Sequence, residues 1–178
     1  NDGIDKIAAD ELAARGFEID RGHYAKEELK AKIKDFDVLI VRSATKVDQE
    51  IIDAAAQGDL RLIVRAGVGI DNIDAAYAQM RGIEVRNTPN ASSDSVAELV
   101  LGHMFSLARF ISIANVTMRD GKWNKKEYEG VELAGKTLGI IGFGRIGRSL
   151  AEKASALGMD VMFHDICVKN DEKFEYAE

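Results

Sequence analysis

Cysteine, proline and tryptophan are nearly absent from the sequence, which has one residue of each among 178. The single cysteine, Cys167, excludes an internal disulfide and a zinc site built from several cysteines, and it favours a reducing, cytoplasmic location. Lysine and arginine are outnumbered, 24 against 30 aspartates and glutamates, so the net charge is −6. This balance argues against nucleic-acid binding, which needs a basic surface. No metal-ligand spacing occurs among the histidines, so we expect no metal site.

Long uncharged runs are rare as well, and only one is long enough to compare with a membrane span. Residues 99–118 carry one charged side chain, that of Arg109, at the middle of the run. An arginine at the centre of a bilayer costs about 3 kcal/mol, so we expect no membrane insertion. The apolar pattern from Ser92 or Ser93 to about Arg119 instead predicts one long helix, covered by a second domain or a second subunit.

Apolar segments of strand length alternate with helical patterns in the first half of the chain, which is typical of an α/β fold with a parallel sheet. The predicted strands are Phe17–Ile19, Val38–Val41, Leu62–Val64 and Ile83–Val85, and the predicted helices are Asp5–Arg15, Lys26–Lys34, Asp48–Gln57 and Asp74–Arg81. The turn residues Asn1-Asp2-Gly3 are typical of a loop after a strand, so we expect a first strand before residue 1. Pro89 precedes the long helix and marks the expected domain boundary.

A glycine motif of the form G-x-G-x-x-G occupies residues 142–147. The predicted strand Thr137–Ile141 precedes it and a helical pattern follows it, which is the context in which this motif binds dinucleotides. Gly142 permits a tight turn, Gly144 permits the backbone to approach a pyrophosphate, and Gly147 permits close packing of helix on strand. The motif therefore predicts a dinucleotide site at the start of this helix.

An acidic residue, Asp165, follows the next predicted strand, Asp160–Phe163, and lies 18 residues after Gly147. A carboxylate at this distance is suited to bind the ribose hydroxyl groups of a dinucleotide. Ile166 and Cys167 come next, so no basic residue is at hand for the 2′-phosphate of NADP, and NAD is the expected cofactor. Two strands of a six-stranded nucleotide domain are predicted here, so we expect the start of a Rossmann domain, incomplete at this end.

Arginine follows three predicted strands of the first half, at positions 42, 65 and 86. The carboxyl ends of parallel strands share one edge of the sheet, where α/β proteins bind ligands. Arg42 and Arg65 are each suited to grip a carboxylate or phosphate, whereas Arg86 is interpreted as a surface charge. Lys46 adds a cation, and the glycine turn at residues 67–69, placed before a helix, offers backbone N–H groups. These features predict a small, doubly anionic substrate.

The histidines and the tryptophan receive structural interpretations. His23 is assigned to a polar loop, His103 to the core or an interface of the long helix, and His164 has no visible acid–base partner. Trp123 is interpreted as a packing anchor. No nucleophile and base occur in a recognisable arrangement, so no catalytic residue is predicted within the chain.

Several segments occur together at intervals that match one known family. They are RAGVGIDNID at 65–74, NTPN at 87–90, SVAEL at 95–99, DGKW at 120–123 and LAGKTLGIIG at 133–142. With them the chain resembles the D-isomer-specific 2-hydroxyacid dehydrogenases over essentially its whole length, and within them the D-3-phosphoglycerate dehydrogenases most closely. The segment RSATKV at 42–47 favours the phosphoglycerate enzymes over the lactate, formate and glycerate relatives.

The resemblance implies oxidation of 3-phosphoglycerate to 3-phosphohydroxypyruvate with NAD, the entry to serine biosynthesis. It implies a flavodoxin-like substrate domain at residues 1–89, without its first strand. The start of a Rossmann NAD-binding domain follows at residues 90–178 and includes an interdomain and dimer helix. A homodimer or homotetramer is the implied assembly.

The resemblance also assigns binding roles to residues of this chain. Its substrate-binding residues would be Arg42, Arg65, Gly67, Val68 and Gly69, the last three through their backbone N–H groups. Its cofactor-binding residues would be Gly142, Gly144, Arg145, Ile146, Gly147 and Asp165. The family's catalytic Arg and its Glu–His pair have no counterpart before Glu178, so residues 1–178 alone are expected to be inactive.

Two alternatives to oxidation of 3-phosphoglycerate stay open. One is a hydroxypyruvate or glyoxylate reductase, which would act on an unphosphorylated substrate. The other is an NAD-regulated corepressor, a binding protein on the same fold that is similar to these dehydrogenases. Lys46, within the RSATKV segment, favours a phosphorylated substrate over the corepressor, and steady-state rates with phosphorylated and unphosphorylated substrates would identify the reductase.

Overall fold

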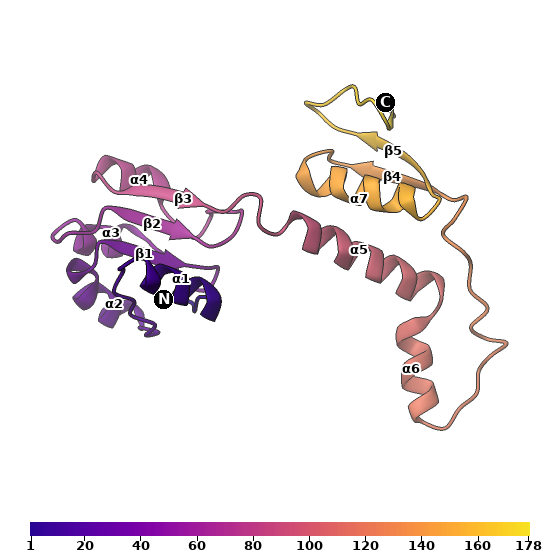
Figure 1. Cartoon of the computed structure of the whole chain (residues 1–178), viewed down its shortest axis with the longest axis horizontal. Coiled ribbons are helices and arrows are strands. Elements are labelled where there is room, and N and C mark those ends of the chain that lie inside the picture. The colour runs from indigo at the N-terminus through magenta and orange to yellow at the C-terminus, as the bar shows by residue number, and fades with distance from the viewer. The chain divides into compact units, whose positions relative to one another are not determined.

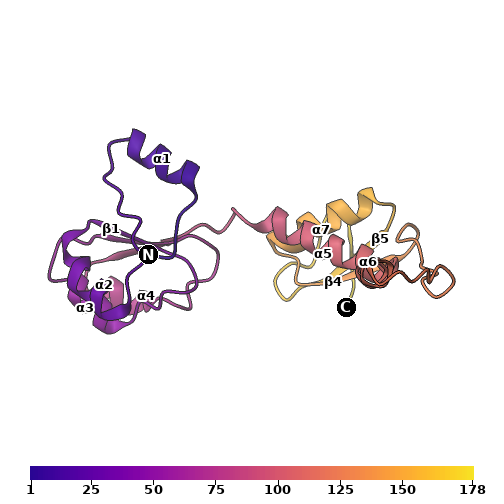
Figure 2. The ribbon, with the colours of Figure 1, turned by 90° about the horizontal axis from the view of Figure 1, so that it is seen from below.

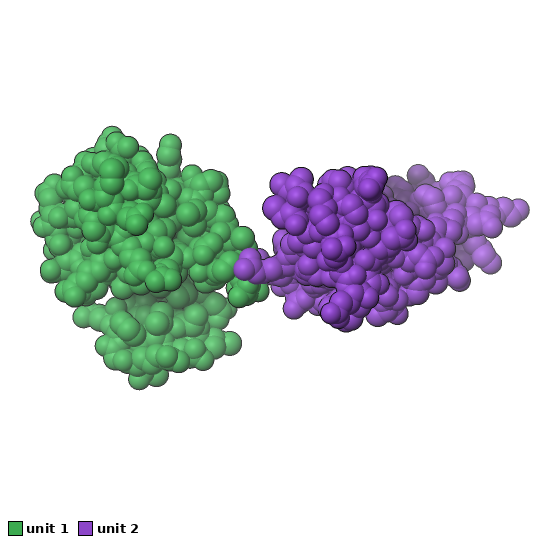
Figure 3. Space-filling view, turned by 90° about the horizontal axis from the view of Figure 1, so that it is seen from above, with its two compact units in different colours: residues 1–91 green, residues 92–178 purple.

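A computed structural model describes all 178 residues, which form two compact units, Asn1–Ala91 (unit 1) and Ser92–Glu178 (unit 2) (Figures 1 and 3). Each unit has its own three-stranded parallel sheet and its own hydrophobic core. Helices make most of the crossover connections, because parallel neighbours cannot be joined by a tight hairpin. The α/β fold class predicted from the sequence is confirmed.

The sheet of unit 1 consists of β1 (Val38–Val41), β2 (Leu62–Arg65) and β3 (Glu84–Asn87), in that order. Its register pairs Val41 with Arg65 and Arg65 with Asn87, so the carboxyl ends of the strands lie level. The helices are α1 (Lys6–Ala14), α2 (Lys26–Lys32), α3 (Gln49–Ala55) and α4 (Ala75–Met80), with a 3₁₀ turn at Ile33–Asp35. Figure 2 shows α1 on one side of the sheet and the other three helices on the opposite side.

The core of unit 1 lies between the sheet and the helices α2, α3 and α4. Its fully buried side chains come from both layers and include Ile33, Val41, Val47, Ile51, Ile52, Ile63 and Ile83. Burial of each such aliphatic side chain contributes about 1.5–3 kcal/mol. Aspartates cap α3 and α4, as Asp5 caps α1: the Asp48 carboxylate accepts from the N–H of Ile51 at 3.3 Å, and Asp74 from that of Tyr77 at 3.0 Å.

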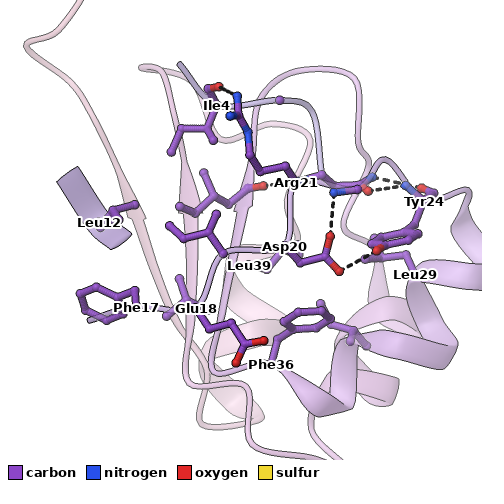
Figure 4. A pocket seen from close by; sticks show the side chains of 17 residues that line it. Ile4, Leu12, Phe17, Glu18, Asp20, Arg21, Tyr24, Leu29, Phe36 and Leu39 are labelled. Atoms are coloured by element: carbon purple, nitrogen blue, oxygen red, sulfur yellow. Dashed lines mark hydrogen bonds between the residues drawn. The ribbon is translucent and has the colours of Figure 1, made fainter. Parts of the chain in front are cut away.

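The predicted strand at Phe17–Ile19 is wrong. The segment pairs with no strand, and the Phe17 side chain is 56% exposed. Residues of this segment and of β1 line a cavity of about 230 Å³ (Figure 4), and no backbone hydrogen bond joins the segment to β1. The strand predicted at Ile83–Val85 is β3, which begins one residue later and ends two residues later, so that Arg86 lies inside it.

The sheet of unit 2 consists of β4 (Thr137–Ile141), β5 (Asp160–His164) and β6 (Glu175–Tyr176), all parallel and in that order. The first two strands match the prediction, whereas β6 was missed because two residues carry no readable periodicity. Between β4 and β5 runs α7 (Arg145–Ala156), whose inner face buries Leu150, Ala151 and Ala154. The helix α5 (Ser93–Ala108) packs against α7.

The predicted single long helix is wrong. It is broken into α5 and α6 (Ile111–Arg119) at Phe110, whose left-handed backbone, with φ of 56°, cannot continue an α-helix, and the two axes bend by 61°. No single helix is long and apolar enough to cross a membrane; only the bent pair, taken together, reaches that length and composition. Many apolar side chains of α5 and α6 are exposed, Leu107 at 79% among them, and their covering by a second domain or a second subunit stays a prediction.

Candidate functional site

The carboxyl ends of β1, β2 and β3 bring the predicted cationic residues of unit 1 to one edge of its sheet. Arg42 follows Val41, the last residue of β1, and Arg65 is the last residue of β2, paired with Val41 in the register. Arg42 is exposed and forms no ion pair. Arg86 instead pairs with Glu84 within β3, as expected of a surface charge. The cationic edge therefore consists of Arg42 and Arg65, with the exposed Lys46 four residues after Arg42.

The glycine turn at residues 67–69 precedes a helix, as predicted, but does not run directly into it. The helix α4 begins six residues later, at Ala75. The N–H of Gly67 donates to the carbonyl oxygen of Arg65 at 2.9 Å, whereas those of Val68 and Gly69 make no hydrogen bond within the chain. Two of the three predicted N–H groups are thus available to an anion, as in a loop-built anion nest.

Arg65 lies against this turn. A β-carbon added at Gly67 would come within 1.4 Å of Nη1 of Arg65, so the guanidinium fills the space that a side chain would need. The Arg65 Nε is buried and has no hydrogen-bond partner. A buried, unpartnered donor is unfavourable in a protein unless a ligand supplies an acceptor. The two free N–H groups and this guanidinium together favour the binding of a carboxylate or phosphate.

Residues that the sequence analysis did not select hold the turn in place from the β3 side. The side-chain amide of Asn87 donates to the carbonyl oxygen of Val68 at 2.6 Å, and the N–H of Thr88 donates to that of Gly67 at 2.9 Å. Both residues belong to the segment NTPN that carried the family resemblance. Asn and Thr after a strand are common turn residues, so spacing alone gave no signal of this role.

The glycine loop of unit 2 connects β4 directly to α7. Gly142 has a left-handed backbone with φ of 97°, and a β-carbon at Gly147 would lie 2.3 Å from the carbonyl oxygen of Gly142. A β-carbon at Gly144, in contrast, would meet no atom within 4 Å. The loop is thus closed where the helix meets the strand and open at the middle glycine, which leaves room for a phosphate group. The predicted packing role of Gly147 is confirmed.

The N-terminus of α7 faces this open space. The helix has 12 residues, begins at Arg145 after the cap residue Gly144, and leaves its first N–H groups without acceptors in the chain. Such N–H groups and the positive end of the helix dipole attract anions. Arg145 and Ile146 are exposed at this end of the helix.

Phe143, between the first two glycines of the motif, is a residue that the sequence analysis missed. Its side chain is fully buried and stacks on Phe163 of β5, with 3.8 Å between the ring centroids. The loop is therefore anchored in the core of unit 2 by an aromatic ring, while its backbone remains at the surface. A large apolar residue between two glycines was the available signal, because a surface loop gains nothing from exposing one.

Asp165 lies directly after β5, and its carboxylate joins two loops. It accepts from the N–H groups of Val168 at 2.9 Å, Phe143 at 2.6 Å and Cys167 at 2.8 Å. These three hydrogen bonds, in that order of importance, lower the pKa of Asp165 to about 2. A carboxylate has about four acceptor positions, so an ionised Asp165 still has capacity for a hydroxyl group of a ligand.

The histidines and the tryptophan contribute no acid–base chemistry to these loops. Nδ1 of His164 lies 2.9 Å from the carbonyl oxygen of Ala177, and its ring stacks on Tyr176. His23 and His103 are exposed, so His103 does not lie in the core of unit 2, and its assignment to an interface stays a prediction. Trp123 is 75% exposed and is not the packing anchor that was predicted.

Comparisons with known proteins agree with the architecture of both units. Residues 3–170 match the sequence profile of the D-isomer specific 2-hydroxyacid dehydrogenase catalytic domain. A hydroxypyruvate reductase of Thermotoga maritima is 49% identical over 166 residues, which are 93% of this chain and 54% of that protein. A D-3-phosphoglycerate dehydrogenase of Methanocaldococcus jannaschii is 51% identical over 140 residues, 79% of this chain and 26% of that protein.

Solved structures show the same fold. The NAD-dependent formate dehydrogenase of Staphylococcus aureus, determined in complex with NAD, superposes with a TM-score of 0.80 at 29% identity. The superposition covers 96% of this chain and 53% of that one. The chain thus spans about half or less of the length of the relatives it matches.

Proposed function

The chain belongs to the D-isomer-specific 2-hydroxyacid dehydrogenases, and from this premise we propose that the complete protein oxidises 3-phosphoglycerate to 3-phosphohydroxypyruvate with NAD. Unit 1 is proposed to bind the substrate and unit 2 the dinucleotide. The observation that carries the substrate assignment is the edge formed by Arg42 and Arg65 beside the glycine turn of unit 1. In an acidic chain, such a cationic edge is suited to a small anion.

In unit 1 the substrate carboxylate is proposed to accept from the N–H groups of Val68 and Gly69. The buried Arg65 Nε is the donor that such an anion would satisfy. Arg42, exposed at the adjacent strand end and followed by Lys46, is proposed to bind the phosphate group. A substrate with charges at both ends would be oriented by the two contacts, and that orientation lowers the entropic part of the barrier.

In unit 2 the pyrophosphate of NAD is proposed to lie against Gly144 and the first turn of α7, with Arg145 and Ile146 beside it. The space open at Gly144 supports this position. Asp165 is proposed to accept hydrogen bonds from the ribose hydroxyl groups through its remaining acceptor capacity. When bound, the nicotinamide of NAD supplies the hydride acceptor for the reaction.

Acid–base chemistry is proposed to come from residues outside this chain. Oxidation of a hydroxy acid needs a base for the hydroxyl proton and a cation near the developing carbonyl oxygen. His164 is engaged with Ala177 and Tyr176, and His23 and His103 are exposed. The role of residues 1–178 is therefore binding and orientation.

Assembly as a homodimer or homotetramer is proposed through α5 and α6. Their exposed apolar side chains include Leu99, Phe105, Leu107, Ile111, Ile113, Val116 and Met118. A contiguous apolar surface of this kind is rare on a monomer and is typical of an interface. Elution as a monomer in size-exclusion chromatography with light scattering would contradict the proposal.

Reduction of hydroxypyruvate is the second candidate function, and the Thermotoga relative with that name supports it. Steady-state kinetics of the complete protein separate the two, in the reductive direction with NADH. A kcat/KM for 3-phosphohydroxypyruvate at least tenfold above that for hydroxypyruvate supports the proposed function. The opposite ratio identifies a hydroxypyruvate reductase, and no turnover of either substrate refutes both assignments.

A further inference from the structure

The loop that carries Arg42 is tied to the loop that carries the glycine turn by one side chain. The amide Nδ2 of Asn72 donates to the carbonyl oxygen of Arg42 at 2.8 Å and to that of Thr45 at 2.7 Å. Asn72 itself belongs to the segment after β2, three residues beyond Gly69. One amide group thus uses both of its donors to hold two strand-end loops together.

The same loop is held from its other side by Asp2. Its carboxylate accepts from the N–H of Arg42 at 2.7 Å, from the N–H of Thr45 at 3.0 Å and from the Thr45 hydroxyl group. Burial raises the pKa of Asp2, but these hydrogen bonds outweigh it and hold the pKa below its usual value. The main chain of Arg42 is therefore fixed at both its N–H and its carbonyl group.

Asn72 is rigidly placed for this task. Its main-chain carbonyl oxygen accepts from the N–H of Val47 at 2.8 Å, and Val47 and Ile73 form a parallel bridge beside it. Val47 is fully buried and Ile73 is 5% exposed, so the bridge is part of the core of unit 1. Asn72 therefore links the loop that carries Arg42 to a segment that the core of unit 1 holds fixed.

We propose that Asn72 is a positioning residue that sets the distance between Arg42 and the glycine turn at residues 67–69. The inference rests on the proposed function, in which these two groups bind opposite ends of one anionic substrate. A flexible arginine pays less conformational entropy on binding when its main chain is already fixed. Asn72 then affects substrate binding without touching the substrate.

The variants Asn72→Ala and Asn72→Asp test this proposal. The first removes both hydrogen bonds, and the second keeps the shape of the side chain but points carboxylate oxygens at two carbonyl groups. Gln49→Ala is the matched control, because the Gln49 amide also joins two segments, donating to Asp74 at 3.1 Å, but makes no hydrogen bond to residues 42–45. Circular dichroism and thermal unfolding verify that each variant folds.

The measurement is the KM for 3-phosphoglycerate in the complete protein at saturating NAD. We expect Asn72→Ala to raise KM about 5- to 10-fold and Asn72→Asp to raise it further, each with less than a twofold change in kcat and in the Kd for NAD. Gln49→Ala is expected to leave KM unchanged. A double-mutant cycle then shows whether Asn72 acts through Arg42. In an Arg42→Ala background, Asn72→Ala is expected to change KM less than twofold.

Three outcomes would overturn the proposal. One is an unchanged KM in Asn72→Ala, and another is an equal increase in KM with and without Arg42. The third is loss of folding in both Asn72 variants, which would assign the residue to stability alone. If Arg42→Ala itself leaves KM unchanged, the proposed substrate role of Arg42 is refuted as well, whereas an effect of Arg42→Ala without one of Asn72→Ala refutes only the present inference.

Discussion

Each unit has a glycine turn at the end of a parallel strand, but the groups suited to attract an anion differ between the two turns. In unit 2 the turn at residues 142–147 runs straight into α7, and the helix N-terminus supplies the donors. In unit 1 the turn at residues 67–69 is followed by a loop, and Arg65 supplies the positive charge. The difference shows that the end of a strand can attract anions either through the N-terminus of the helix that follows it or through cationic side chains beside it.

The supports of the two turns differ in the same way. Phe143 anchors the unit 2 turn in an aromatic stack, whereas the amides of Asn72 and Asn87 hold the loops of unit 1. Apolar anchors are expected to matter chiefly for stability, and polar bridges at a surface chiefly for geometry. The following predictions test this contrast.

The largest effect is expected for Phe143→Ala. Loss of a fully buried, stacked ring should reduce the free energy of unfolding of unit 2 by about 3–5 kcal/mol. Phe17→Ala in unit 1 is the control, because that ring is half exposed, and a change within about 0.5 kcal/mol is expected. Hydrogen exchange at the amides of β1 and β4 measures both. Equal losses of unfolding free energy in the two variants would show that the Phe143 ring contributes no more to stability than a half-exposed ring.

The next largest effects are expected on binding, where different variants impair substrate binding and NAD binding. Arg42→Ala and Arg65→Ala should each raise KM for 3-phosphoglycerate about 30-fold, equivalent to about 2 kcal/mol, and leave the Kd for NAD unchanged. Asp165→Ala should instead leave the KM for 3-phosphoglycerate unchanged and weaken NAD binding about 10- to 100-fold. It should also reduce the preference for NAD over NADP. Steady-state kinetics and calorimetry of the complete protein give both constants.

The control for the arginine variants is Arg86→Ala, which removes a guanidinium paired with Glu84 at the surface. It should leave both constants unchanged. If the Arg42 and Arg65 variants raised KM equally for phosphorylated and unphosphorylated substrates, the phosphate would have no partner in unit 1.

Two Gly→Ala variants within unit 2 sharpen the role of the closed loop. In Gly147→Ala the new β-carbon meets the Gly142 carbonyl oxygen, so a loss of about 1–3 kcal/mol in unfolding free energy is expected, with weaker NAD binding. In Gly102→Ala, inside α5, it meets nothing within 4 Å, and helix propensity predicts a gain of up to about 1 kcal/mol. Denaturant unfolding compares them, and a stabilised Gly147→Ala would contradict the observed packing.

The smallest effect is expected in the acid stability of unit 2. The pKa of Asp165 is about 2 in the folded chain and near 3.9 when unfolded. A depressed pKa stabilises the folded state above about pH 4, and this contribution is lost as the pH falls toward 2. Asp165→Asn should therefore show a flatter decline in stability across this range than the wild type. Asp160→Asn, at the exposed start of β5, serves as control, and parallel curves for all three proteins would refute the assignment.

Local sequence pattern was sufficient for the elements that carry the two turns. The apolar runs at β1, β2 and β4 predicted strands because buried parallel strands are apolar on both faces. The glycine motif predicted the start of α7, since only glycine meets the backbone angle of Gly142 and the close contact at Gly147. Arg42 and Arg65 were found because parallel strands place their carboxyl ends at one edge.

Only the tertiary structure decided the features that depend on distant partners. The segment Phe17–Ile19 has strand propensity but no neighbour to pair with, and the break of the long helix depends on the backbone of Phe110. The anchoring of Phe143 on Phe163 and the bridging by Asn72 join residues 20 and 30 positions apart. Such contacts leave no periodic trace in the sequence, because hydrogen bonds and ring stacking between distant segments are set by how the chain packs, not by the spacing of its residues.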